Sequence, residues 1–187
     1  MKVLIVDNKD SFTYNLKHYI NHFFDDVDVV RCNKLQLKDV DCYDKVLFSP
    51  GPGLPNEYPI LNDILSKYGS SKSILGICLG QQTIAEFYGG KLDRLPDSMH
   101  GIASKITHLS NCILYKNLPA SFQIGHYHSW VVSDKNFPAE LEITSVNENG
   151  FIMSIKHKKY DIKAVQFHPE SILTEYGLRL IENWLFD

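Results

Sequence analysis

The sequence has few cysteines, and their positions exclude two common uses of this residue. Four thiols are spread along 187 residues, and no two of them stand at the spacing of metal ligands. We therefore expect reduced cysteines, with no disulfide framework and no zinc site. The thiols are Cys32, Cys42, Cys78 and Cys112.

Eight histidines raise the question of another kind of metal site. His18 and His22 stand one helical turn apart, but no cysteine lies near them in the sequence. His126 and His128 alternate along an expected strand, so they would share one face and could hold a metal in principle. Because no carboxylate or cysteine accompanies this second pair, we predict no metal site in the chain.

Long apolar runs and dense basic runs are also missing. No stretch approaches the roughly 20 apolar residues of a membrane-spanning helix, and the first residues lead into an expected strand without the pattern of a signal peptide. The formal net charge is −3, and the one short basic run, Lys156–Lys159, is typical of a solvated hairpin. We therefore expect a cytoplasmic protein that binds neither membrane nor nucleic acid.

Internal repeats and low-complexity linkers are absent as well. The length of 187 residues and the hydrophobic content of 44% suit one substantial core. We therefore predict a single domain over residues 1–187.

Buried strands alternate with helices in the first half of the sequence, which predicts an α/β fold with a doubly wound, mainly parallel sheet flanked by helices. After residue 101 the strands become shorter and turns separate them, which predicts an antiparallel extension. The expected strands are Val3–Val6, Val27–Arg31, Val46–Phe48, Ile74–Ile77, Ile102–His108, Gln123–Tyr127, Glu140–Val146, Phe151–Lys156 and Ile162–Gln166. The expected helices are Thr13–Phe24, Ile60–Tyr68, Leu79–Tyr88 and Glu175–Phe186.

The segment Gly76–Gly80 lies between an expected strand and an expected helix, with a thiol at its centre. Glycines two residues on either side of Cys78 are what a nucleophile elbow needs, because its turn is strained and its helix packs close to its strand. The first turn of a helix also favours an anionic thiolate through its free N–H groups and its dipole. A buried, inert apolar residue is the alternative interpretation of a single cysteine.

A histidine and a glutamate follow the last expected strand. Pro169 disfavours a helical conformation at His168, so we expect an extended segment that places His168 and Glu170 on the same side. A thiol nucleophile needs a base, and the base needs an acceptor that fixes its tautomer. Cys78, His168 and Glu170 supply these roles, so we predict a catalytic triad, with a surface loop and a capping carboxylate as the alternative.

A glycine-bearing loop, Ser49–Gly53, follows directly after another expected strand. Acyl transfer needs backbone N–H groups directed at the developing oxyanion, and glycines can offer them without side chains in the way. One donor would come from Gly51 or Gly53, and the other from Leu79, the residue after the candidate nucleophile. On its own, the loop sequence would indicate only a turn.

These motifs, in this order, closely resemble the class I glutamine amidotransferases. The first and last of the shared blocks are typical of one branch, the small glutaminase subunits of anthranilate synthase and aminodeoxychorismate synthase. The resemblance spans almost the whole chain. Its blocks are Val6–Asn15, Ser49–Gly53, Gly76–Gln82, Tyr88–Gly90, His100–Gly101, Tyr127–Ser129 and Gln166–Leu173.

The resemblance implies an activity and a set of site residues. Cys78 would attack the side-chain amide of glutamine, release ammonia and form a glutamyl thioester that water hydrolyses, while His168 moves the proton and Glu170 orients His168. The residues assigned to glutamine and oxyanion binding are Gly51, Pro52, Gly53, Leu79, Gln82, Ser129 and Trp130.

Two of these assignments also have simpler alternatives. Gln82 stands four residues after the nucleophile and therefore on the same helix face, although a solvent-facing position would suit it equally well. Ser129 and Trp130 follow an expected strand, where a packed aromatic residue is an ordinary feature.

The chain is too short to bind and aminate a second substrate, so the acceptor site would lie on another polypeptide. The resemblance implies a large chorismate-using synthase subunit that receives ammonia through an internal passage and itself needs Mg²⁺, whereas we expect no cofactor in this chain. We expect this partner to dock at Asp10–Tyr14 and at the rim of the Cys78 pocket. Asp10 or Ser11 could instead cap a helix.

The main interpretation is the glutaminase subunit of anthranilate synthase, in tryptophan biosynthesis. The alternative is the corresponding subunit of aminodeoxychorismate synthase, in folate biosynthesis, or one subunit shared by both. The other classes considered are a cysteine hydrolase that acts alone and a non-catalytic subunit. Gln81, Ile102 and His126 depart from the histidine, lysine and arginine common in the family, and none of them belongs to the predicted triad.

Overall fold

The computed structural model describes all of residues 1–187, which form nine strands, four α-helices and three short 3-10 helices. The strands are β1 (Val3–Asp7), β2 (Val27–Arg31), β3 (Lys45–Phe48), β4 (Ser73–Ile77), β5 (Leu92–His108), β6 (Ser121–Val132), β7 (Leu141–Asn147), β8 (Ile152–His157) and β9 (Ile162–Val165). The helices are α1 (Thr13–Asn21), α2 (Pro59–Tyr68), α3 (Leu79–Phe87) and α4 (Gly177–Leu185), with η1 (Leu37–Cys42), η2 (Pro55–Glu57) and η3 (Ile113–Tyr115) between them.

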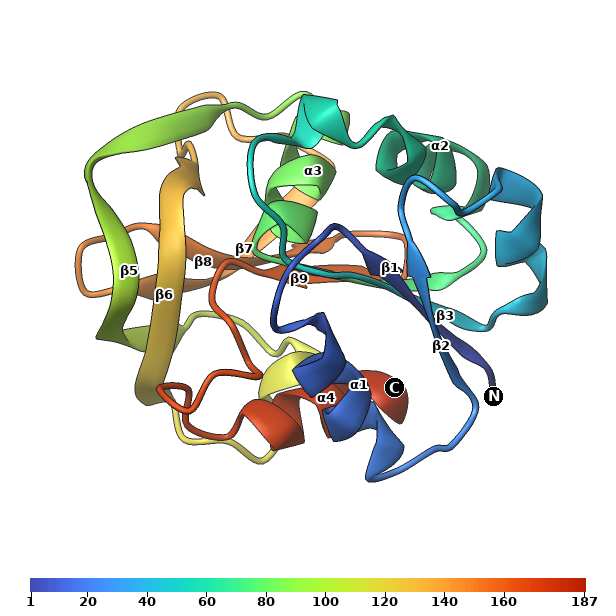
Figure 1. Ribbon diagram of the computed structural model, residues 1–187. Coiled ribbons are helices and arrows are strands. Elements are labelled where there is room, and N and C mark those ends of the chain that lie inside the picture. Colours follow the sequence, from blue (N-terminus) through green and yellow to red (C-terminus); the bar gives the residue numbers. More distant parts are fainter.

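All nine strands belong to one curled sheet (Figure 1). Their order is β2-β1-β3-β4-β9-β8-β7-β5-β6. The strands from β2 to β9 in this order pair in parallel, and those from β9 to β6 pair antiparallel. The predicted parallel sheet with an antiparallel extension is therefore confirmed.

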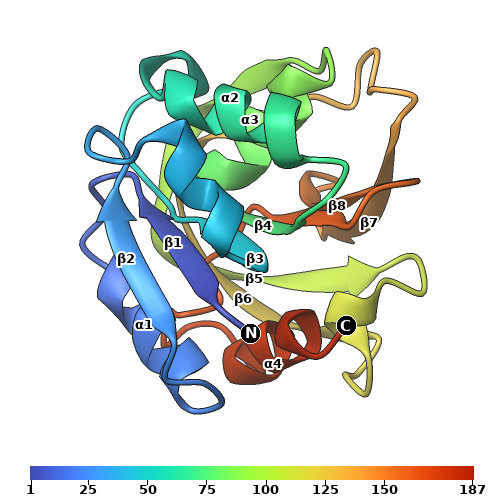
Figure 2. The same ribbon diagram turned by 90° about the vertical axis from the view of Figure 1, so that its right-hand side faces the viewer.

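Helices cover both faces of the parallel part of the sheet. Figure 2 shows α2 and α3 above the sheet and α1 and α4 below it. In β1, Val3 and Ile5 pack in the core cluster that contains residues of α1 and α4, whereas Leu4 and Val6 pack in the cluster that contains residues of α2 and α3. Successive side chains of a strand point to opposite faces, so this fully apolar strand fills two cores at once.

The antiparallel part contains the largest departure from the expected elements. The strand expected at Ile102–His108 begins ten residues earlier, at Leu92, and its pairing with β6 is interrupted by two register shifts. Pro96 and Gly101 lie in the added part, and most of its side chains are exposed. Because those residues lack a buried apolar alternation, the sequence gives no strand signal there.

The partner strand β6 also extends beyond its expected end. The prediction Gln123–Tyr127 covers only its centre, so Ser129 and Trp130 lie within the strand and not after it. Leu92 pairs with Val132, so the additional residues of β5 and β6 pair with each other.

The expected ends of the first and last helices also need correction. Helix α1 ends at Asn21, and its N-cap is Phe12, with no side-chain cap. The Asp10 carboxylate accepts the Phe12 N–H at 2.8 Å, so neither Asp10 nor Ser11 caps the helix. Helix α4 begins only at Gly177, because Tyr176 has the left-handed φ of 59°.

None of the helices combines the length and the apolar character that crossing a membrane requires.

Candidate active site

Cys78 lies at a sharp turn between β4 and α3, as the elbow prediction requires. Its backbone has φ 52° and ψ −100°, which is a strained conformation for a residue with a side chain. The residue is the N-cap of α3 and is 5% exposed. The thiol therefore lies at the positive end of a helix.

The two glycines of the elbow are required by close packing. A Cβ atom on Gly76 would lie 2.6 Å from the carbonyl carbon of Gly80, and one on Gly80 would lie 2.8 Å from the carbonyl oxygen of Phe48. Both distances are shorter than any ordinary contact. Helix α3 can therefore approach β3 and β4 only where these side chains are missing.

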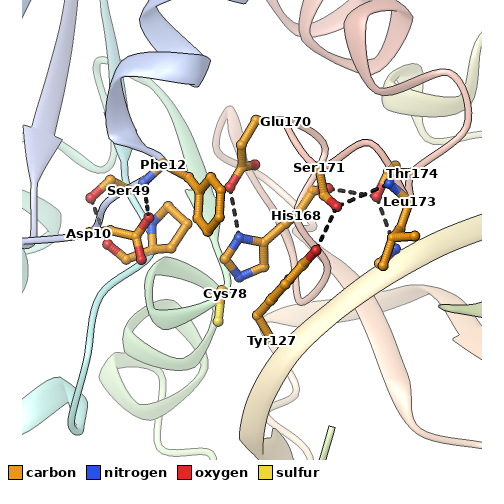
Figure 3. Close-up of polar contacts among 12 residues, drawn as sticks. Asp10, Phe12, Ser49, Cys78, Tyr127, His168, Glu170, Ser171, Leu173 and Thr174 are labelled. Carbon is orange, nitrogen blue, oxygen red and sulfur yellow. Dashed lines mark hydrogen bonds and ion pairs between the residues drawn. The ribbon is translucent and has the colours of Figure 1, made fainter. Parts of the chain in front are cut away.

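His168 and Glu170 lie together beside the thiol (Figure 3). Nδ1 of His168 is 2.7 Å from Oε1 of Glu170, and both residues are buried. The other ring nitrogen, Nε2, points toward Cys78. The structure thus places the predicted nucleophile, base and orienting acid in one group, in that order.

The backbone that presents this pair differs from the prediction. Residues 168–171 form a tight turn, in which the Ser171 N–H donates to the carbonyl oxygen of His168 at 3.1 Å. Pro169 occupies the second position of the turn, where its fixed φ is favourable. The expectation of an extended segment was therefore wrong, although the turn also brings Glu170 to His168.

The environment of His168 favours the imidazolium form. Burial alone would lower its pKa, but the neighbouring Cys78 thiol and the hydrogen-bonded Glu170 carboxylate raise the pKa well above the ordinary value of 6.5. An imidazolium held between a carboxylate and a thiol is the arrangement that stabilises a thiolate.

A cavity of about 280 Å³ opens at Cys78 and brings most of the predicted binding residues together. Leu79 is the one predicted binding residue that does not line this cavity. The predicted residues that line it are Gly51, Pro52, Gly53, Gln82, Ser129 and Trp130. The additional lining residues are Leu54, Ser98, His100, Tyr127 and His128.

The loop Ser49–Gly53 is fastened to the end of β1. The Asn8 N–H donates to Oγ of Ser49 at 2.9 Å, and Nδ2 of Asn8 donates to the Ser49 carbonyl at 2.8 Å. A Cβ atom on Gly51 would lie 2.7 Å from the side chain of Leu79, so the loop packs against the elbow. The backbone N–H groups of Gly51, Gly53 and Leu79 donate no hydrogen bond within the protein, which leaves them available to an oxyanion.

Gln82 is buried, so a solvent-facing position for it is excluded. Its Nε2 donates to the carbonyl oxygen of Trp130 at 3.1 Å and to Oε1 of Gln166 at 3.3 Å. Nε2 of Gln166 lies 3.6 Å from the sulfur of Cys78. Gln166 was missed as a site residue, because it reads as the last buried position of a strand.

His126 and His128 share one face of β6, as their spacing predicts. Nδ1 of His126 is 2.9 Å from Nε2 of His128, and Nε2 of His126 is 2.6 Å from Oγ of Ser104. Burial, with a contribution from neighbouring histidines, lowers the pKa of His126 to about 4 and that of His128 to about 3. The two rings are therefore neutral and bond to each other, and no group of three or more His, Cys, Asp or Glu residues is placed to hold a metal ion.

A second cavity of about 280 Å³ is also lined by Cys78. It shares Gly51, Pro52, Cys78, His100 and Tyr127 with the first cavity. The residues found only in the second are Lys9, Asp10, Ser11, Phe12, Pro50 and His168. Cys78 therefore lines two adjoining cavities, one of which extends toward the loop before α1.

Comparison with known proteins agrees with the fold. The family model described as "Glutamine amidotransferase class-I" matches residues 4–187. The chain belongs to the class-I glutamine amidotransferase family.

Two relatives narrow the comparison within the family. Anthranilate synthase component 2 of Pyropia yezoensis is 41% identical over 98% of this chain and 98% of the relative. Aminodeoxychorismate synthase component 2 of Escherichia coli is also 41% identical, over 98% of both chains. The predicted family and branch are therefore confirmed.

A solved structure of a GMP synthase subunit from Thermoplasma acidophilum has the same fold. It superposes with a TM-score of 0.89 over 100% of this chain and 92% of the other, at 22% sequence identity.

Proposed function

We propose that this chain is the glutaminase subunit of a chorismate-using synthase, with anthranilate synthase as the first candidate. The observation that carries the proposal is the buried group of Cys78, His168 and Glu170, whose thiol lines a cavity. Its lining offers backbone and amide groups suited to a small polar substrate such as glutamine.

The geometry supports a two-step reaction. The thiolate of Cys78 would attack the side-chain carbonyl carbon of glutamine, and the oxyanion would accept hydrogen bonds from the N–H groups of Leu79 and the Gly51–Gly53 loop. His168 would give its proton to the departing nitrogen, which leaves as ammonia, while a glutamyl thioester forms.

Water would complete the second step. His168, now neutral, would take a proton from a water molecule that attacks the thioester carbonyl, and the sulfur would leave with its electron pair. Glu170 would hold the same tautomer of His168 throughout, because its Oε1 stays bonded to Nδ1. These steps use only side-chain and backbone groups of this chain.

The two adjoining cavities that Cys78 lines support separate routes for glutamine and ammonia. Glutamine would occupy the cavity lined by Gln82, Ser129 and Trp130, and ammonia would leave through the cavity lined by Ser11, Phe12 and His168. The second route opens toward the surface where we expect the large subunit to dock.

Exposed apolar side chains near this opening favour a protein partner. Phe12 and Tyr14 are 40% and 65% exposed, Ile102 is 47% exposed, and Ile172 is 98% exposed. Such residues are typical of a surface that another chain covers. The partner would be the chorismate-using subunit, whose own requirement for Mg²⁺ and whose cytoplasmic location with this chain are parts of the proposal.

Aminodeoxychorismate synthase is the second candidate. Its component 2 in Escherichia coli and the anthranilate synthase component 2 of Pyropia yezoensis are equally similar to this chain, at 41% identity each. A single subunit that serves both synthases would also be consistent with these equal sequence identities.

The test is glutamate release from glutamine by the purified chain, alone and with each candidate large subunit plus chorismate. We expect release to rise with the partner and anthranilate to form, whereas aminodeoxychorismate would favour the second candidate. The nearly isosteric Cys78→Ser variant should bind the partner and lose at least about 10³-fold in glutamate release. Full activity in that variant would exclude Cys78 as the nucleophile.

A further inference from the structure

Two buried glutamine side chains connect the wall of the proposed glutamine cavity to the nucleophile. Gln82 follows the elbow on α3, and Gln166 follows β9; they are 3% and 0% exposed. Their amide groups form one path of hydrogen bonds that starts at the carbonyl oxygen of Trp130 and ends at the sulfur of Cys78.

The pairing of β4 with β9 explains why Gln166 reaches the thiol. Ile77 pairs with Val165, and the Cys78 N–H donates to the Val165 carbonyl at 2.8 Å. Cys78 and Gln166 are the next residues of the two strands, so they lie side by side at the same edge of the sheet. The Gln166 N–H donates to the carbonyl of Met153 at 2.8 Å, which fixes its backbone.

The direction of the path is determined by its first acceptor. A carbonyl oxygen can only accept, so Gln82 must direct its NH₂ group toward Trp130. The same NH₂ group also donates to Gln166, so the side-chain oxygen of Gln166 faces Gln82. The NH₂ group of Gln166 therefore faces the sulfur of Cys78. Turning either amide around would place two oxygens or two NH₂ groups against each other.

We propose that Gln166 is a catalytic residue whose NH₂ group donates to the Cys78 thiolate, and that Gln82 and the Trp130 carbonyl hold it in that orientation. This inference rests on the proposed function, since it concerns the same nucleophile. The donor at 3.6 Å is a side chain and adds to the backbone groups at the start of α3. A donor to an anionic sulfur stabilises the thiolate more than the neutral thiol.

The role of Gln82 is consequently different from that of a simple substrate ligand. Its NH₂ group is already shared between Trp130 and Gln166. A substrate that contacts Gln82 or Trp130 would change the stability of the thiolate through these same amides. The cavity and the nucleophile are therefore connected by hydrogen bonds.

The experiment follows the alkylation of Cys78 by iodoacetamide between pH 5 and pH 9, with mass spectrometry of the Cys78 peptide to separate it from the other thiols. Only the thiolate reacts, so the midpoint of the rate profile reports its stability. The variants are Gln166→Met, which keeps the length and removes the donor, Gln82→Met, and the double variant. Gln81→Met is the matched control.

Gln81 is a suitable control residue because it is a neighbouring buried glutamine that does not hydrogen-bond to the sulfur of Cys78. It is 0% exposed and its Nε2 donates to the carbonyl of Ile152 at 3.4 Å. Any general effect of replacing a buried amide should therefore appear in the control as well.

We expect Gln166→Met to move the midpoint upward by about one pH unit and to slow alkylation about tenfold below it. Gln82→Met should move it in the same direction by less, and the double variant should match Gln166→Met, because both substitutions break one path. Gln81→Met should leave the midpoint unchanged. An unchanged midpoint in folded Gln166→Met would overturn the proposal.

If Gln166→Met does not fold, as judged by circular dichroism, Gln82→Met decides the question, since it leaves the neighbour of the sulfur in place. An unchanged midpoint in that variant would then overturn the proposal. Alkylation needs neither glutamine nor a partner subunit. The result is therefore separate from glutamate release, whose absence in the wild-type protein would instead count against the proposed function.

Discussion

His168 and the pair His126–His128 are buried within the same site, yet their protonation is shifted in opposite directions. The pKa of His168 is raised well above its ordinary value, whereas burial lowers that of His126 to about 4 and that of His128 to about 3. Burial opposes the charged form in all three residues. The difference lies in the partners, because His168 has a carboxylate and a thiol, while the other two have no acidic partner.

This difference separates a candidate base from neutral support. His168 can hold and return a proton because acidic groups stabilise its charged form. The neutral pair can only donate and accept hydrogen bonds, which position the cavity wall at His128. Removing or exchanging the partners should therefore convert one type of histidine toward the other.

The largest effect is expected from removing His168. We expect His168→Ala to lower the rate of glutamate release by about 10³-fold or more, because the site loses its base and its proton donor. Steady-state kinetics with the partner subunit is the measurement. The control is His18→Ala, which changes an exposed histidine of α1 and should keep full activity. Equal rates for His168→Ala and the wild type would show that the base lies elsewhere.

A smaller effect is expected from removing the charge beside His168. Glu170→Gln should lower the pKa of His168 toward the range of the buried pair and slow glutamate release by about 10²-fold. An NMR titration of the ring and the steady-state rate give the two quantities. Glu175→Gln is the matched control, because that carboxylate accepts the Gln123 N–H and does not contact His168. A pKa that stays raised in Glu170→Gln would contradict the assigned cause.

The smallest effect concerns stability in acid. Below pH 6.5 the unfolded chain protonates His126, while the folded protein keeps this residue neutral down to about pH 4. The free energy of unfolding therefore decreases as the pH falls through that window. The loss should be about 2 kcal/mol between pH 7 and pH 5. His126→Gln should lose less over the same range, as measured by urea unfolding at both pH values. Parallel losses in variant and wild type would exclude His126 as a source.

His168 changes the free energy of unfolding with pH in the opposite direction. Its raised pKa stabilises the folded protein below pH 6.5, and this contribution is lost as the pH rises through the folded value. The two histidine types therefore oppose each other in the acid range. Glu170→Gln should consequently make the protein more sensitive to acid, which the same unfolding series can measure.

The sequence predicts the elbow well, because every requirement for it is local. The strand, the helix and the flanking glycines are all read within residues 73–88, and the strained backbone at Cys78 follows from them. The parallel sheet is predictable for a related reason, since its buried strands are short apolar runs separated by helices.

Features that depend on pairing between distant segments could not be read in this way. The start of β5 at Leu92 is held by β6 and has no apolar pattern of its own. The contact of Gln166 with Cys78 depends on the register of β4 against β9. The turn at Pro169 was misjudged because a proline after His168 is compatible with both an extended chain and a tight turn.

The contact between Gly76 and Gly80 has a consequence for engineering. Each glycine lies where a single added methyl group would collide with backbone, so neither position can vary while the other and Phe48 stay in place. A mutant library aimed at new acyl substrates should hold both glycines constant and diversify the cavity wall at Ser98 and His100. Those two side chains line the cavity on β5 and are exposed.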